Sequence, residues 1–240
     1  MNTTLLAGYG LVKCYPSRAL PALDGVTVAV GSGEIIAVVG HNGAGKSTLF
    51  ELLGGLSLPT AGTVELLVEP SQVGWCPQRE IIDWSLTVRQ NIALGLELRD
   101  PHTRKLAKDA VVEAAAALQL TDYLDRTAET LSGGELRRTQ IARAMAGSPA
   151  LMILDEPTTG LDPAGIEFVF KNLELRRQDG ASALISTHET SRFSQHCTRV
   201  IAMAEGRVLA DLPVGDYLAI APTSTDDLWD SYVELRERDS

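Results

Sequence analysis

The sequence predicts an α/β fold with a mostly parallel sheet, an antiparallel β edge and an all-helical insertion. Short apolar runs of strand length recur at 34–39, 150–154 and 181–186. A stretch of helical character at 163–178 lies between the last two runs and closes at Asp179-Gly180. This strand–helix–strand order indicates parallel neighbouring strands with helices packed on the sheet faces.

The composition fits one large globular domain. The chain has 240 residues, of which 45% are hydrophobic and 22% are charged, and one domain usually takes ~100–200 residues. The 21 basic residues against 31 acidic ones give a net charge of −10. We expect no nucleic-acid partner, because proteins that bind nucleic acids present a basic surface to the phosphates. A small basic pocket for a nucleotide is compatible with this charge.

The cysteines and the apolar runs indicate a cytosolic chain. Cys14, Cys76 and Cys197 are odd in number, far apart and without metal-ligand spacing, which is typical of a reducing compartment. Residues 1–10 lack the charged region and long apolar stretch of a signal peptide. The most apolar runs fall far short of the ~20 residues that a spanning helix needs. We therefore expect a chain that does not cross a membrane by itself.

The margins of the sheet are predicted to be antiparallel. Residues 4–15 and 26–30 show a loose alternation of apolar and polar side chains. Residues 199–204 and 207–211 flank Glu205-Gly206, a dipeptide that predicts a hairpin turn. Antiparallel strands at the edges of a parallel sheet account for both patterns.

Two segments depart from the alternation of strands and helices along the chain. No convincing strand lies between about 86 and 140, and 107–120 is rich in alanine and leucine, so we expect an all-helical insertion there. From Pro222 the tail has an acidic amphipathic pattern through Glu237. That pattern predicts either a short terminal helix or a frayed end.

A phosphate-binding loop follows the first apolar run. The residues are Gly40, His41, Asn42, Gly43, Ala44, Gly45, Lys46, Ser47 and Thr48, which match G-x4-G-K-[ST] between a strand and a helix. Glycines let backbone N–H groups converge on an anion, and the helix that follows adds its positive end. Lys46 is expected to reach the β- and γ-phosphates of a nucleotide, and Ser47 to bind Mg²⁺. A glycine-rich turn with a stray lysine is the alternative.

Two adjacent carboxylates end the second apolar run. Asp155 and Glu156 follow residues 151–154 directly, at the edge where α/β sheets bind ligands. Asp155 is placed to hold Mg²⁺, directly or through water, and Glu156 to polarise an attacking water as general base. Simple solvent contacts at a strand end are the alternative.

A third motif lies between these two. Leu131-Ser132-Gly133-Gly134-Glu135, here called the signature segment, precedes a helical stretch at 136–146. Ser132 and Glu135 form a capping box, so a well-made helix start is one interpretation. A capping box does not need the glycine pair, which costs ~1 kcal/mol each in helix propensity. Bare N–H groups at this helix start form a second anion site, although the chain has one phosphate loop.

These three motifs, in this order, resemble the ATP-binding subunit of ABC transporters over residues from about 4 to 211. The resemblance implies a phosphate-loop NTPase core with ATP and Mg²⁺ as cofactors. It also implies that two subunits pack head to tail. Ser132, Gly133 and Gly134 of one subunit would then close on the γ-phosphate held by the other.

The resemblance assigns four further residues. Gln78 takes the place of a lid glutamine that touches Mg²⁺ and water, and His188 that of a switch histidine that contacts the γ-phosphate. Asp162 lies in a loop that crosses the dimer seam, and Tyr15 takes the place of an aromatic residue that stacks on adenine. If the resemblance is set aside, each residue has a plainer interpretation. Gln78 would be a surface residue, His188 would hydrogen-bond to the backbone at a strand end, and Tyr15 would pack in an edge strand.

The expected function is a motor subunit with ATPase activity. We expect one ABC-type ATP-binding domain, with a core at 1–85 and 146–215, a helical subdomain at 86–145 and a tail at 216–240. Its partners would be a second ATP-binding subunit, identical or paralogous, and a separate membrane permease whose substrate the sequence leaves open. It would lie at the cytoplasmic face of the membrane and power export, as in the ABC-2 branch.

Two other functions are compatible with single motifs. A soluble ABC ATPase of translation or DNA repair is the main alternative, but the chain lacks tandem domains, a heptad array and a basic surface. A small-molecule kinase or GTPase leaves residues 131–135 unexplained.

Overall fold

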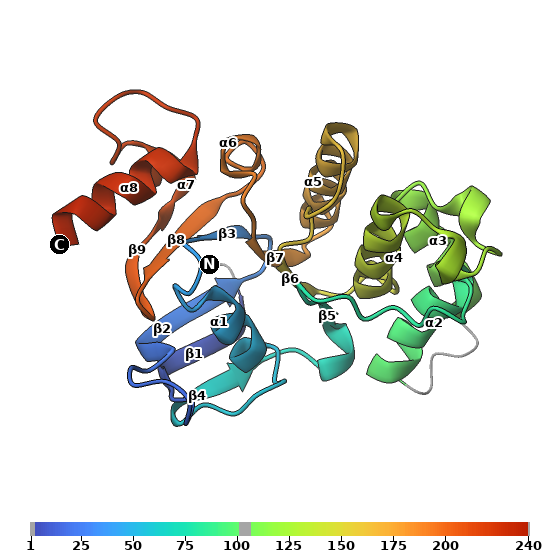
Figure 1. Ribbon diagram of the computed structural model, residues 1–240, viewed down its shortest axis with the longest axis horizontal. Coiled ribbons are helices and arrows are strands. Elements are labelled where there is room, and N and C mark those ends of the chain that lie inside the picture. The colour runs from blue at the N-terminus through green and yellow to red at the C-terminus, as the bar shows by residue number, and fades with distance from the viewer. Residues whose placement is uncertain (1–2, 101–106, 240) are drawn as a thin grey trace.

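The computed structural model describes residues 3–100 and 107–239 and is built around two sheets (Figure 1). The larger sheet has the order β5-β6-β7-β3-β8-β9, in which β9 alone among these strands runs antiparallel to its neighbour. The smaller sheet is antiparallel with the order β2-β1-β4. The strands are β1 (Thr4–Lys13), β2 (Leu23–Gly31), β3 (Ile35–Val39), β4 (Ala61–Leu66), β5 (Val73–Cys76), β6 (Leu151–Asp155), β7 (Ser182–Ser186), β8 (Arg199–Ala204) and β9 (Arg207–Pro213).

Helices are distributed around these sheets. One helix follows β3, and α2, α3 and α4 gather at one end of the molecule, while α8 lies at the opposite end beside β9 (Figure 1). The helices are α1 (Lys46–Leu53), α2 (Val88–Arg99), α3 (Ala107–Ala117), α4 (Gly133–Met145), α5 (Pro163–Gln178), α6 (Thr190–Phe193), α7 (Val214–Leu218) and α8 (Leu228–Asp239). None of the helices in the described part of the chain is long and apolar enough to cross a membrane.

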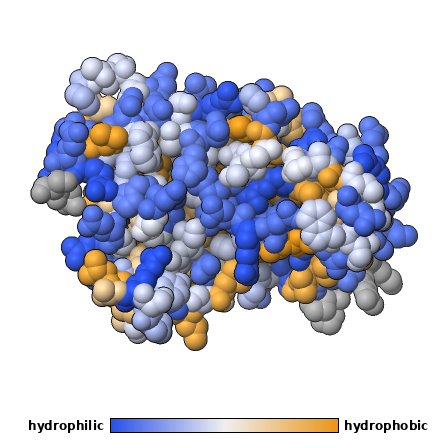
Figure 2. All heavy atoms as spheres, viewed as in Figure 1, coloured by the Kyte–Doolittle hydropathy of each residue, from blue (hydrophilic) through white to orange (hydrophobic). Residues whose placement is uncertain are grey.

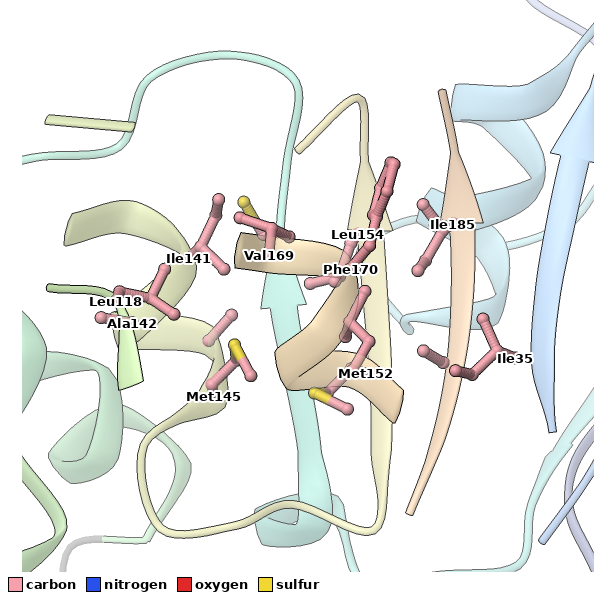
Figure 3. Packing of buried hydrophobic residues seen from close by; sticks show 14 of the residues in the cluster. Ile35, Leu118, Ile141, Ala142, Met145, Met152, Leu154, Val169, Phe170 and Ile185 are labelled. Atoms are coloured by element: carbon pink, nitrogen blue, oxygen red, sulfur yellow. The ribbon is translucent and has the colours of Figure 1, made fainter. Parts of the chain in front are cut away.

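The larger sheet is buried on both faces because side chains alternate along each strand. In β3, Ile36 and Val38 face a core that includes α1 and the smaller sheet. Ile35, Ala37 and Val39 face a second core on the other side of the sheet. Figure 3 shows how that second core continues from β6 and β7 across α5 to α3 and α4. The helical group is therefore packed continuously against the strands that carry the site.

The predicted fold class is confirmed. The parallel order of β6, α5 and β7 is present, and α5 spans Pro163–Gln178 as predicted. The hairpin at Glu205-Gly206 joins β8 and β9. The described residues between 86 and 140 form helices and turns with one isolated bridge, between Thr87 and Thr127. Of the two alternatives for the tail, the helix is found, as α8.

Two strands have no counterpart in the sequence prediction. β4 is an edge strand whose side chains are nearly all exposed, so it carries no apolar alternation. β5 has only four residues and contains Gly74. A Cβ at Gly74 would lie 2.2 Å from the carbonyl oxygen of Ala144, so α4 requires a glycine where it crosses the strand.

Candidate nucleotide-binding site

A polar cleft of about 310 Å³ opens at the carboxyl ends of β3, β6 and β7. Because β7 lies between β6 and β3, the loops that follow these three strands converge at one edge of the sheet. The cleft, here called the nucleotide cleft, is lined by Arg18, Asn42, Gly43, Gly45, Lys46, Ser47, Thr48, Gln78, Asp155, Glu156 and His188. All of these except Arg18 were predicted as site residues.

The phosphate loop is fixed by close backbone packing. A Cβ at Gly40 would lie 2.4 Å from the carbonyl oxygen of Met203 in β8, and Gly45 has φ +106° with the Ala22 oxygen 2.7 Å from such a Cβ. Both positions therefore require glycine. Gly40, His41 and Ala44 do not line the cleft but form the base of the loop.

Lys46 begins α1 at the floor of the cleft. Its Nζ donates to the carbonyl oxygen of Gly40 at 2.6 Å and to that of His41 at 3.3 Å. Burial lowers the pKa of Lys46, while the nearby carboxylates of Glu156 and Asp155 act in the opposite direction. Gly45 provides no side-chain cap for α1, so the first N–H groups of the helix are available to an anion.

Ser186, a residue that the sequence analysis missed, holds the side chain of Asp155 and the backbone of Glu156. Its hydroxyl donates to Asp155 Oδ1 at 2.5 Å and accepts from the Glu156 N–H at 2.9 Å. Glu156 has φ +49°, a left-handed conformation that is strained for a non-glycine residue. Its Oε1 lies 3.3 Å from Nε2 of His188. Asp155 and Glu156 are each 4% exposed although they line the cleft, so both residues are largely shielded from bulk water.

The donor set of the cleft suits a magnesium ion that also binds phosphate oxygens. Ser47, Asp155 and Gln78 supply a hydroxyl, a carboxylate and an amide oxygen to the same cleft. Mg²⁺ is usually held by one or two carboxylates together with substrate phosphates rather than by an all-protein cage. The three residues predicted as metal ligands therefore fit the ion.

Arg137 in α4 is a second residue that sequence reasoning missed. The side chain is buried, and its guanidinium donates to five backbone carbonyl groups. The acceptors are those of Pro77 at 3.1 Å, Gln78 at 3.5 Å, Asp155 at 3.0 Å, Glu156 at 2.6 Å and Pro157 at 3.0 Å. One side chain thus ties α4 to the backbone at Gln78 and to the backbone at Asp155 and Glu156. No local pattern distinguishes Arg137 from the adjacent Arg138 in the sequence.

The signature segment lies outside the nucleotide cleft. Ser132 caps α4, with Ser132 Oγ accepting from the Glu135 N–H at 3.4 Å and Glu135 Oε2 accepting from the Ser132 N–H at 2.7 Å. The predicted capping box is therefore present. Gly133 lines a separate hollow of about 270 Å³ that also contains Gln78. The structure does not bring the signature segment to the phosphate loop of the same chain.

Asp162 and Tyr15 also lie outside the residues that line the cleft. Asp162 is the N-cap of α5, accepting from the Gly165 N–H at 2.7 Å. Tyr15 is half-buried, and the Nζ of Lys13 lies 5.3 Å from its ring centroid. The Tyr15 carbonyl accepts from the Arg18 N–H at 3.0 Å. This turn brings Arg18, which no sequence pattern had indicated, to the cleft.

The fold and this cleft define a nucleotide-binding protein of the phosphate-loop class, and comparisons with known proteins narrow the class. The family model described as ABC transporter matches residues 23–159. The Nod factor export ATP-binding protein I of Rhizobium sp. (strain N33) is 33% identical over 211 residues, which cover 84% of this chain and 68% of that protein. The chain belongs to the ABC transporter family, as an ATP-binding component.

Other relatives differ in length and in stated direction of transport. ATP-binding cassette sub-family A member 7 of Rattus norvegicus is 35% identical over 206 residues, covering 82% of this chain and 9% of that protein. The chain thus spans about a tenth of the length of such relatives. Methionine import ATP-binding protein MetN of Haemophilus influenzae is 34% identical over 218 residues, covering 85% of this chain and 63% of that protein.

Solved structures have the same fold. The structure of an ATP-binding subunit of an ABC transporter matches with a TM-score of 0.85 at 26% identity, covering 97% of this chain and 99% of that one. That of cbiO1 from Clostridium perfringens, part of the ABC transporter complex cbiONQ, matches with a TM-score of 0.75 at 27% identity, covering 90% and 91%.

Proposed function

We propose that two copies of this subunit, or one copy and a paralogue, pack head to tail around ATP and drive a separate membrane permease. The observation that carries the proposal is the bare signature segment. A Cβ at Gly133 would meet no atom within 4 Å, and one at Gly134 would lie 3.8 Å from its nearest neighbour. Neither packing nor a left-handed backbone in this chain requires glycine there, although glycine loses more conformational freedom on folding than any other residue.

That cost is explained if another molecule approaches the start of α4. The capping box occupies the N–H groups of Ser132 and Glu135, which leaves those of Gly133 and Gly134 to bind an anion. The γ-phosphate of an ATP in the cleft of a second copy is such an anion. Asp162, at the N-terminus of α5, would face the same seam.

The chemistry proposed for the cleft is ATP hydrolysis. Lys46 holds the β- and γ-phosphates, and the loop N–H groups surround them. A magnesium ion, held by Ser47, Asp155 and Gln78, would neutralise phosphate charge. Glu156 takes a proton from the attacking water, and His188, at 3.3 Å from its carboxylate, orients that water. Tyr15 stacks on the adenine ring.

The pH dependence of hydrolysis gives a test of the general base. Burial raises the pKa of Glu156 above its ordinary value of 4.5, while His188 and Lys46 lower it. A base works only when deprotonated, so the acid limb of kcat is expected above pH 4.5. Because His188 lowers the pKa of Glu156, the substitution His188→Gln should move this limb to higher pH. The measurement is kcat against pH at saturating ATP, and a limb that moves to lower pH would contradict the assignment.

An apolar groove supports the proposal of a membrane partner. The groove has a volume of about 510 Å³ and lies between α1, β4 and α2. Leu58 is 82% exposed and Leu98 68% exposed at this groove. Figure 2 shows a mostly hydrophilic face with several apolar patches along its lower edge, where Figure 1 places β4 and α2. Exposed apolar surface of this kind is typical of a protein interface, and we assign it to the permease.

We propose that the subunit works at the cytoplasmic face and drives export. The motifs Gly40-His41-Asn42 and Pro157-Thr158-Thr159-Gly160 resemble the ABC-2 exporter branch, and the Nod factor export relative supports that direction. Co-purification with detergent-solubilised membranes should recover an integral membrane protein. Transport in oriented vesicles of the reconstituted complex should run away from the side that carries this subunit. Transport toward that side would place the complex among importers, such as the methionine import relative.

A further inference from the structure

The C-terminal helix α8 contacts the phosphate loop through one hydroxyl group. The N–H of His41 donates to Tyr232 Oη at 3.3 Å, and the two rings lie 6.4 Å apart between centroids. Tyr232 is 2% exposed. Nothing in the phosphate-loop motif or in the mechanism above uses this contact. It joins two residues that are 191 positions apart in the chain.

The docking of α8 does not depend on that hydroxyl. Leu228, Tyr232 and Leu235 form an apolar stripe at helical spacing. Leu228 and Tyr232 belong to the core on the α5 side of the sheet, and Leu235 packs against it. The ring of Trp229 lies 4.8 Å from that of Tyr232, and Arg236 Nη2 lies 3.8 Å from Glu205 Oε1 in the β8–β9 turn. These contacts hold α8 in place, so its docking does not require the Tyr232 hydroxyl, which instead binds the phosphate loop.

The His41 peptide that Tyr232 holds is also linked to Lys46. In the peptide unit that joins Gly40 to His41, the carbonyl oxygen of Gly40 accepts from Lys46 Nζ at 2.6 Å. The N–H of the same unit, that of His41, donates to Tyr232 Oη. One peptide unit is thus bound on one side by α8 and on the other by the lysine that contacts the phosphates. Because this peptide unit is already fixed before the nucleotide arrives, the loop loses less conformational freedom when the nucleotide binds.

We propose that Tyr232 is a positioning residue for the phosphate loop, so that docking of α8 sets the affinity for nucleotide. This inference rests on the proposed nucleotide site. Because α8 lies at the end of the molecule opposite to α2, α3 and α4 (Figure 1), its effect reaches the nucleotide through the loop and not through the signature segment. By linkage, a bound nucleotide must in turn stabilise the docked helix.

The test compares two tyrosine hydroxyl groups. Tyr232→Phe is expected to raise the Kd for ADP and the KM for ATP about threefold to tenfold, the effect of one hydrogen bond, with a smaller change in kcat. Tyr217→Phe is the matched control, because Tyr217 is buried in the same core and its hydroxyl has no hydrogen-bond partner in the described structure. Its nucleotide affinity should equal that of the wild type. Equal Kd values for the wild type and Tyr232→Phe would overturn the proposal.

Hydrogen exchange tests the same coupling without a variant. ADP is expected to slow amide exchange in α8 of the wild-type chain and to do so less in Tyr232→Phe. Unchanged exchange in α8 on saturation with ADP would also overturn the inference. A wild-type chain that binds no ADP at all would instead contradict the proposed function, so the two failures are distinguishable.

Discussion

A Glu156→Gln variant is expected to bind ATP with unchanged affinity and to hydrolyse it about 10²–10⁴-fold more slowly, the usual contribution of a general base. The amide keeps the size of the side chain but cannot accept a proton from water. Glu156 is 4% exposed and lies 3.3 Å from His188, so bulk water cannot take over its role as general base. Because ATP then persists, the variant should accumulate as a dimer in ATP and remain monomeric in ADP. The measurements are turnover and molar mass in each nucleotide.

Glu189→Gln is the matched control for that variant. It makes the same chemical change one residue after His188, at a half-buried residue whose carboxylate lies 3.9 Å from Arg192 Nε. Its turnover and its mass should match the wild type. Rapid hydrolysis by Glu156→Gln would remove Glu156 from the role of base.

Arg137→Met is expected to cause the largest loss of stability. The guanidinium satisfies five buried or part-buried carbonyl groups, and methionine satisfies none. Leaving a buried acceptor without a partner costs about 1–3 kcal/mol, so we expect the free energy of unfolding to fall by at least about 3 kcal/mol. Turnover should fall as well, because the Glu156 and Gln78 backbones lose a common anchor. Urea unfolding and ATPase assays measure the two effects.

A variant of the neighbouring Arg138 tests whether the losses are specific to Arg137 or follow from removing any positive charge from α4. Arg138 is half-buried, and its Nη1 donates to the carbonyl oxygen of Leu118 at 3.3 Å, within the helical group. Arg138→Met should therefore lower the unfolding free energy by only about 1 kcal/mol and leave turnover near that of the wild type. Equal losses in the two variants would contradict the assigned role of Arg137.

Local patterns were enough to predict the centre of the cleft. The pair Asp155-Glu156 ends a short apolar strand, Lys46 follows another across the glycine-rich loop, and the parallel order of strands brings their carboxyl ends together. His188, two residues after β7, was assigned by the resemblance to the ABC family and not by a local pattern. These residues are found together because their positions depend on a strand that each adjoins in sequence.

Residues that depend on distant partners were not predictable in this way. Arg137 bonds Pro77, which is 60 positions away, and Tyr232 bonds His41 across 191 positions. No spacing rule connects such pairs, because their contact follows from how α4 and α8 pack on the finished sheet. β4 was missed for a related reason, since an exposed edge strand shows no apolar periodicity.

The account depends most on the claim that a second copy completes the ATP site. The specific ATPase rate, measured against protein concentration with the molar mass recorded in parallel, tests this most directly. The account predicts a rate per chain that rises with concentration as the dimer forms and then levels off. Ser132→Arg, which leaves the nucleotide cleft intact, should bind ATP but show neither the rise nor the dimer. A wild-type rate that is full in a monomeric preparation and constant on dilution would contradict the shared site.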